Sequence, residues 1–197
     1  MLAPNSQVLL GTRNPGKLRE IQKVLADLGL VFLSLADFPD VNDIEETGST
    51  FAENARLKAV HYRAATGRAS LADDSGLLVD ALGGRPGVLS ARFAPTDPER
   101  ISKVLELVCA FPDPEQRTAH FVCALCLATA EGMIEVEGRV SGFVAAKPSG
   151  SGGFGYDPIF YYPPAGKTFA EMTADEKNAV SHRAVALGLL HDKLKHR

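Results

Sequence analysis

Short apolar runs and helically spaced apolar positions alternate along the first third of the chain. Gln7 to Gly11, which contains the apolar residues Val8, Leu9 and Leu10, predicts a short buried strand. Asn14-Pro15 follows, the arrangement of an N-cap with proline at the first helical position, and Gly29 is a typical helix stop. Val31 to Leu35 predicts a second strand. The apolar positions of the intervening helix are Leu18, Ile21, Leu25 and Leu28.

The next segment repeats this order of helix and strand. Thr50-Phe51-Ala52-Glu53 fits a capping box, so a helix should start there, run to about Thr66 and stop at Gly67. Ala69 to Ala72 predicts a buried strand that ends in the polar run Asp73-Asp74-Ser75-Gly76.

The second half adds β-rich runs to the pattern. Asp97-Pro98 should open a helix that ends before Pro112, and Thr118 to Thr129 and Met133 to Val140 should form a hairpin around Glu131-Gly132. A glycine-rich loop follows, and a capping box at Thr173 should start one last helix with an apolar stripe of Val180, Ala184, Leu187, Leu190 and Leu194. Strands interleaved with helices, plus a hairpin, predict an α/β protein with a mixed sheet.

Composition narrows the class of protein. The formal net charge is −3, whereas a general DNA- or RNA-binding protein normally carries a basic excess, so nucleic acid is not an expected partner. No apolar run approaches the ~20 residues that span a bilayer, and the N-terminus has no signal-peptide pattern. We therefore expect no membrane association and a cytoplasmic location. Cys123 and Cys126 match C-x-x-C, but they lie in an apolar β run, where small core residues are expected rather than a redox or zinc site.

The segment Gly11 to Lys17 is the first candidate for chemistry. It lies between a predicted strand and a helix, where free backbone N–H groups and the helix dipole favour an anion, and Arg13 and Lys17 add positive charge. The spacing almost matches the P-loop pattern, but Leu18 stands where Ser or Thr must coordinate magnesium. A P-loop NTPase is therefore disfavoured, and any metal ligands should come from elsewhere; the alternative is an ordinary strand–helix turn.

Two acidic pairs can supply those ligands. Asp73-Asp74 ends a predicted strand, a usual place for functional side chains in an α/β sheet, and Glu45-Glu46 lies in a polar loop. Because neighbouring strand residues face opposite sides, only one of the two aspartates should point into a site. Magnesium usually takes one or two carboxylates together with waters and substrate phosphates. Solvated surface carboxylates are the competing interpretation, stronger for Glu45-Glu46 than for Asp73-Asp74.

Three further groups carry weaker signals. The two aromatic residues in Gly152 to Pro158 have two interpretations: stacking on a base, or a place in the core beside a tight turn. His182-Arg183, near Lys177 at the start of the last predicted helix, offers donors for a base carbonyl. Asn54 and Lys58 share one helix face at i, i+4 spacing; Lys58 there could add charge near a metal, but the spacing by itself favours a solvated surface.

Taken together, these segments resemble the inosine triphosphate pyrophosphatase family, whose members remove dITP and XTP. The matching runs follow one another in family order over nearly the whole chain, which makes the match more specific than any single run. They are Thr12 to Lys17, Glu45 to Gly48, Phe51 to Ala55 with Lys58, Ala72 to Leu77, Gly83 to Val88, Ser90 to Arg92, Gly152 to Phe160, Glu176-Lys177 and Ser181 to Ala184.

The resemblance implies a single domain over residues 1–197 with a long mixed sheet flanked by helices, two lobes with a central cleft that holds the active site, and a homodimer. It also implies Mg²⁺-dependent hydrolysis of dITP, ITP and XTP to the monophosphate and pyrophosphate, which keeps these nucleotides out of DNA and RNA. Asp74 would bind the metal and accept the proton of the attacking water, and Glu45 or Glu46 would complete the metal site. The residues expected to bind substrate are Thr12, Arg13, Asn14, Pro15, Gly16 and Lys17 for the triphosphate, Ser75, Phe154, Gly155, Tyr156, Asp157 and Lys177 for the nucleoside, and His182 and Arg183 for the 6-keto purine.

Two alternatives remain open from sequence. One is a pyrophosphatase for modified pyrimidine or other nucleotides, as in the related Maf-type proteins. The other is a nucleotide-binding regulatory module without catalysis, which the acidic pairs disfavour because a triphosphate binder gains little from carboxylates without a metal.

Overall fold

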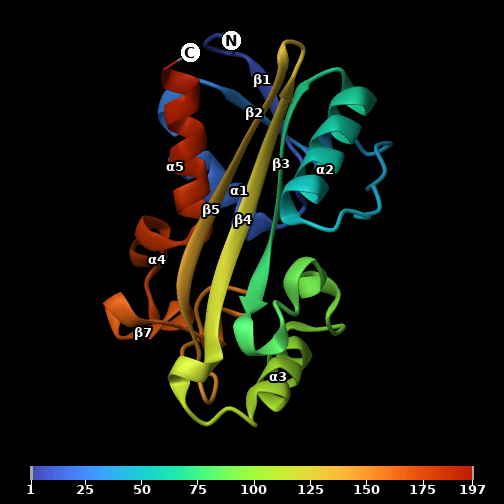
Figure 1. Cartoon of the computed structure of the whole chain (residues 1–197). Coiled ribbons are helices and arrows are strands. Elements are labelled where there is room, and N and C mark those ends of the chain that lie inside the picture. The colour runs from blue at the N-terminus through green and yellow to red at the C-terminus, as the bar shows by residue number, and fades with distance from the viewer. Residues whose placement is uncertain (1, 197) are drawn as a thin grey trace. The chain divides into compact units, whose positions relative to one another are not determined.

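The computed structural model describes residues 2–196, in which helices and strands are interleaved (Figure 1). The strands are β1 (Gln7–Leu10), β2 (Val31–Ser34), β3 (Ala69–Val79), β4 (Thr118–Thr129), β5 (Gly132–Val144), β6 (Phe160–Tyr162) and β7 (Lys167–Thr168). The α-helices are α1 (Pro15–Val24), α2 (Phe51–Thr66), α3 (Asp97–Val108), α4 (Ala174–Val180) and α5 (His182–Lys195). Short 3-10 helices lie between them, among them Ala26–Leu28 and Gly87–Arg92.

The strands form one mixed sheet in the order β2-β1-β3-β4-β5-β6-β7. β1 pairs in parallel with β2 and with β3, whereas β6 pairs antiparallel with both β5 and β7. The expected α/β class with a mixed sheet flanked by helices is therefore confirmed. The hairpin of β4 and β5, coloured yellow to orange in Figure 1, supplies the longest strands.

The described chain divides into two compact units. Unit 1 contains the residues up to Asp74, Cys123–Gly138 and the residues from Arg183 onward. Unit 2 contains Ser75–Val122 and Arg139–His182. The chain therefore passes from one unit to the other within β3, β4 and β5, and once more between His182 and Arg183.

In unit 1, both faces of β1 are buried. On one face, α1 and α5 pack on the sheet through Ile21, Leu25, Leu187 and Leu190, which are at most 1% exposed. On the other face, Tyr62 of α2 packs with Leu9 of β1 and with Leu35 of the 3-10 helix Leu35–Asp37, which follows β2. Burial at ~25 cal/mol per Å² of apolar surface is the main force that holds these helices on the sheet.

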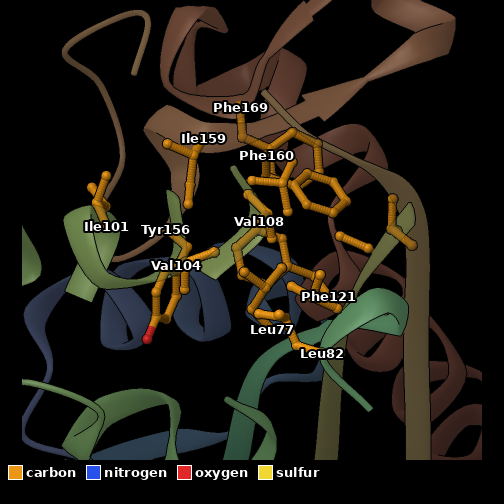
Figure 2. Close-up of a cluster of buried hydrophobic side chains, with 14 of the residues drawn as sticks. Leu77, Leu82, Ile101, Val104, Val108, Phe121, Tyr156, Ile159, Phe160 and Phe169 are labelled. Atoms are coloured by element: carbon orange, nitrogen blue, oxygen red, sulfur yellow. The ribbon is translucent and has the colours of Figure 1, made fainter. Parts of the chain in front are cut away.

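Unit 2 has its own core, built from β3, α3, β4 and the segment that follows β5 (Figure 2). Phe121, Phe160 and Phe169 pack against one another with ring centroids 4.6 to 5.8 Å apart. Tyr156 lies at the edge of this cluster, and its hydroxyl group donates to the carbonyl oxygen of Ser90 at 2.9 Å. The buried hydroxyl group of Tyr156 therefore has a hydrogen-bond partner, as buried tyrosine hydroxyl groups usually do.

Two element boundaries predicted from sequence are wrong. β3 does not end at Ala72 but continues through Asp73 and Asp74 to Val79, because Leu77 and Val79 resume the buried apolar positions. The single last helix is in fact two helices, since Ser181 has extended backbone angles (φ −70°, ψ 157°) between α4 and α5. The strands β6 and β7 were not predicted; their runs are too short for a periodic signal.

Candidate active site

The loop between β1 and α1 is held by the N-cap that the sequence predicts. Asn14 Oδ1 accepts from the backbone N–H groups of Gly16, at 2.8 Å, and Lys17, at 3.2 Å. The Thr12 hydroxyl oxygen accepts from the Asn14 N–H group at 3.2 Å. The backbone N–H groups of Asn14, Gly16 and Lys17 are therefore not free for an anion, and the expectation from sequence is wrong for these three groups. An anion here would rely on side chains, chiefly the ammonium group of Lys17.

Lys17 extends to a buried carboxylate of β3. Its Nζ atom lies 2.8 Å from Asp73 Oδ2, and a guanidinium nitrogen of Arg183 lies 3.5 Å from the same oxygen. Arg183 also donates to Glu20 Oε2 at 2.5 Å. Burial alone would raise the pKa of Asp73, but the charges of Lys17 and Arg183 outweigh it and the pKa is lowered. Asp73 is therefore an ionised residue that joins the start of α1 to the start of α5.

Asp74, the next residue of β3, faces helix α2. Its Oδ2 atom accepts from the Asn54 side-chain amide at 3.1 Å, and Lys58 Nζ lies 3.6 Å from its Oδ1 atom. Lys58 Nζ also lies 2.6 Å from Glu46 Oε1. Asp73 and Asp74 thus contact different elements, as the alternation of a strand requires.

The electrostatic environment of Asp74 differs from that of Asp73. Burial raises the pKa of Asp74, and the nearby charge of Glu46 raises it further, against the opposing effect of Lys58. Burial lowers the pKa of Lys58, but Asp73, Asp74 and Glu46 outweigh it, so its pKa is raised. Lys17, Glu46, Lys58, Asp73 and Asp74 together form what we call the lysine–carboxylate cluster, which lies entirely within unit 1.

The two residues of the acidic loop have different positions. Glu46 is half-buried and paired with Lys58, whereas Glu45 is exposed to solvent. Within residues 2–196, no group of three or more His, Cys, Asp or Glu side chains forms a metal cage. Glu46 and Asp74 are two carboxylates close enough for Glu46 to raise the pKa of Asp74, and carboxylate oxygens are ligands that Mg²⁺ commonly takes in proteins.

The glycine-rich loop of unit 2 carries a second arrangement of expected site residues. Asp157 Oδ2 accepts from the Phe154 backbone N–H group at 2.8 Å and from Lys177 Nζ at 2.5 Å. The same ammonium group lies 4.6 Å from the centroid of the Phe154 ring, a cation–π distance. The Gly155 N–H group donates to Asp97 Oδ2 at 2.9 Å, a contact of α3 that the sequence did not suggest. This arrangement fixes the loop backbone and leaves Phe154 half-buried.

The remaining residues expected to bind substrate have distinct environments. Tyr156 is 4% exposed within the core of unit 2, so of the two loop aromatics only Phe154 has a partly exposed side chain. His182, also in unit 2, stacks on Phe121 with centroids 4.6 Å apart. Ser75 is half-buried in β3, and Arg183, in unit 1, is 1% exposed among carboxylates.

Two interpretations made from sequence have clear outcomes in the structure. A solvated face for Asn54 and Lys58 is wrong: Asn54 is fully buried and the side chain of Lys58 is 12% exposed. Their i, i+4 spacing opposite an acidic strand was the available signal. Cys123 and Cys126 are free thiols buried in the core, as expected for that apolar run. Across the described residues, none of the helices has the length and apolar character of a membrane crossing.

The sequence is similar to known proteins over nearly its whole length. The sequence model of the Ham1 family matches residues 8–193. A dITP/XTP pyrophosphatase of Geobacillus kaustophilus is 50% identical over 191 residues, which covers 95% of this chain and 93% of the relative. A dITP/XTP pyrophosphatase of Photorhabdus laumondii is 48% identical, with 96% of this chain and 98% of the relative covered.

Solved structures give the same result. The structure of a HAM1 protein from Coxiella burnetii superimposes with a TM-score of 0.90 at 45% identity and covers 98% of this chain and 100% of that protein. A dITP/XTP pyrophosphatase from Mycobacterium abscessus has a TM-score of 0.77 at 45% identity, with 93% of this chain and 97% of that protein covered.

Proposed function

The chain belongs to the Ham1 family, and from this premise we propose that it hydrolyses dITP, XTP and ITP to the monophosphate and pyrophosphate. The enzyme class is that of the curated relatives, a nucleoside triphosphate pyrophosphatase. The observation that carries the proposal for this chain is the lysine–carboxylate cluster. Lys17, near the start of α1, pairs with Asp73 of β3, and its charge also affects the pKa of the neighbouring Asp74. The cationic helix start and the acidic strand therefore lie close together in unit 1.

Magnesium is the cofactor that the proposal requires. Glu46 and Asp74 would hold it, with Glu45 as the exposed neighbour in the same loop. When bound, Mg²⁺ would neutralise phosphate charge and orient the triphosphate. The donor set supports this assignment, because hard carboxylate oxygens with substrate phosphates are the usual magnesium ligands in proteins.

The residues of the chain supply binding and proton transfer. Lys17 presents its ammonium group to phosphate oxygens and stabilises the charge that develops on them. Asp74 accepts a proton from the water whose oxygen attacks at the α–β anhydride, and the broken bond releases pyrophosphate. The burial that raises the pKa of Asp74 makes its carboxylate a stronger base for this step.

Selection of the base is assigned to unit 2. Phe154 offers a ring for stacking, while Asp157 and Lys177 fix the loop that carries it. His182 is the donor proposed for the 6-oxygen of the purine, with Arg183 as its neighbour in sequence. A donor aimed at the 6-oxygen meets an amino group in adenine, and such a mismatch discriminates by roughly 10⁴-fold or more.

A panel of purified nucleoside triphosphates with Mg²⁺ tests the proposal, with pyrophosphate and orthophosphate measured separately. We expect pyrophosphate from dITP, ITP and XTP and little from dATP, dUTP or dTTP. Asp74→Asn should abolish release, and Asp43→Asn, which alters an exposed carboxylate in the same unit, should not. Orthophosphate as the direct product, or full activity of Asp74→Asn, would overturn the assignment.

We also propose that the protein is a homodimer and that it is located in the cytoplasm. Light scattering on the purified protein should give twice the mass of one chain, and a mass equal to one chain would remove the dimer.

A further inference from the structure

Asn54, near the start of α2, has a side chain that is fully buried and hydrogen-bonded at both ends. Its Oδ1 atom accepts from the Gly48 backbone N–H group at 2.8 Å, and its Nδ2 atom donates to Asp74 Oδ2 at 3.1 Å. The orientation of this amide is set by chemistry, because a backbone N–H group only donates and a carboxylate only accepts. Asn54 is therefore a bridge between a loop and β3.

The loop end of this bridge is held closely against α2. A Cβ atom at Gly48 would lie 2.6 Å from Asn54 Oδ1 and 2.7 Å from Glu53 Cβ, so the backbone approaches the helix as only glycine allows. The next residue, Ser49, donates its N–H and hydroxyl groups to Glu53 Oε2 at 2.7 and 2.8 Å. The position of Gly48 is thus fixed relative to the first turn of α2.

Glu46 lies two residues before Gly48 in this same loop. Its carboxylate is 2.6 Å from Lys58, which lies one helical turn after Asn54 and is 3.6 Å from Asp74 Oδ1. The two oxygens of Asp74 are therefore held separately, Oδ2 by an uncharged amide and Oδ1 by an ammonium group. Lys58 and Asn54 thus both connect Asp74 to the loop that carries Glu46. Lys58 does so as a charged group, and Asn54 does so through uncharged hydrogen bonds.

We propose that Asn54 is a positioning residue of the reaction, which sets the spacing between the carboxylates of Glu46 and Asp74. This inference rests on the proposed function for those two residues. Groups that orient a metal ligand or a catalytic base typically contribute about 10- to 100-fold in metal affinity or activity. Asn54 has this role towards Asp74 and, through Gly48, towards Glu46.

Two substitutions separate the two ends of the bridge. Asn54→Leu removes both hydrogen bonds at nearly constant volume. Asn54→Asp keeps an acceptor for the Gly48 N–H group but replaces the donor to Asp74 with a like charge. Tyr62→Phe is the matched control, because Tyr62 also lies on α2 and donates to the loop that precedes the helix, at 3.0 Å to Asp43 Oδ1, without contact to Asp74.

The kinetic measurement is kcat and KM for dITP with saturating Mg²⁺, well below the melting temperature of each variant. We expect kcat to fall about 10- to 100-fold in Asn54→Leu and Asn54→Asp, with KM within about threefold of the wild type. Tyr62→Phe should keep kcat within about twofold, since its bond does not orient Asp74. A merely structural role for Asn54 would lower the melting temperature and leave kcat unchanged; that result, or a fall in kcat no larger than that of Tyr62→Phe, would overturn the proposal.

Binding of Mn²⁺ without nucleotide, measured by electron paramagnetic resonance, tests the same bridge independently of turnover. We expect the affinity of Asn54→Leu to be about 10-fold or more below that of the wild type, and equal affinities would count against the role. If the wild type bound Mn²⁺ but released no pyrophosphate, the proposed function would fail, and a lower Mn²⁺ affinity of Asn54→Leu would then show only that Asn54 sets the spacing of the two carboxylates. If Asn54→Leu does not fold, Gly48→Ala displaces Asn54 Oδ1 by contact, and wild-type kcat and Mn²⁺ affinity in that variant would overturn the proposal.

Discussion

Replacing Asp73 by asparagine should destabilise the protein far more than its small change in volume suggests. The carboxylate is 2% exposed and lies 2.8 Å from Lys17 and 3.5 Å from Arg183, whose side chain is also 2% exposed. Without the negative charge of Asp73, the buried guanidinium group of Arg183 keeps Glu20 as a counter-ion but loses Asp73. Loss of one partner of a buried ion pair costs about 3–5 kcal/mol.

Urea denaturation at pH 7 measures this loss directly. Thermal denaturation is a second measurement of the same loss. For a chain of this size, about 1 kcal/mol corresponds to a shift of roughly 2–4 °C in Tm, so Asp73→Asn should melt roughly 6–20 °C below the wild type. The control is the same substitution at Asp43, whose side chain is 62% exposed and pairs with an exposed Arg13 at 3.3 Å. Solvent screening limits such a pair to less than about 1 kcal/mol.

A comparison with Lys17 shows where the stability resides. If the Lys17–Asp73 contact carries part of the loss, Lys17→Met and Asp73→Asn together should destabilise less than the sum of the two single variants. The argument would be refuted if the free energy of unfolding of Asp73→Asn lay within about 1 kcal/mol of the wild type, or fell no further than that of Asp43→Asn. Either result would mean that loss of the Asp73 charge leaves no costly buried charge behind.

Other predictions concern the thiols and the core of unit 2. In the native protein at pH 8, a thiol reagent should modify the exposed Cys109 only, whereas all three cysteines should react in urea. Burial raises the pKa of Cys123 and Cys126 from 9.0 to about 12, so unfolded thiols ionise first and the free energy of unfolding should fall as the pH rises above about 9. A Cys123→Ala, Cys126→Ala variant should lose the slope between about pH 9 and 10, since Tyr156, whose pKa burial raises from 10.0 to about 12, adds to the slope only at higher pH; an unchanged slope in that window would assign it to other groups. Tyr156→Phe should cost about 1 kcal/mol in urea denaturation, because the Ser90 carbonyl oxygen loses its donor; an unchanged midpoint would count against that bond.

Much of the fold was predictable because local signals agree with the tertiary structure. The capping boxes at Thr50 and Thr173 and the Asn14 cap are each formed, and Gly67 closes α2 in a left-handed conformation. Such caps act within one helical turn, so the sequence alone determines them. Ser181 carries no comparable local signal, and the break there accompanies burial of His182 and Arg183 by residues distant in sequence.

The candidate site was predicted less completely for the same reason. Lys17 and Asp74 were recognisable from their types and positions, but the environment of Asp73 depends on Arg183, 110 residues away. Asn54 looked like part of a solvated face because an isolated helix has no means of showing what covers it. Contacts between distant segments decide which polar residues are buried, and no spacing rule within one segment reports them.

The division of the chain has a consequence for its synthesis. Unit 1 is made of three separate stretches, and the last of them begins at Arg183. A ribosome therefore completes every residue of unit 2 before it releases the helix that carries Leu187 and Leu190, whose side chains close the apolar face shared with α1. Loss of α5 alone would therefore uncover this apolar face in a polypeptide that already contains every residue of unit 2, so an intact unit 2 does not protect the chain against a truncation before α5.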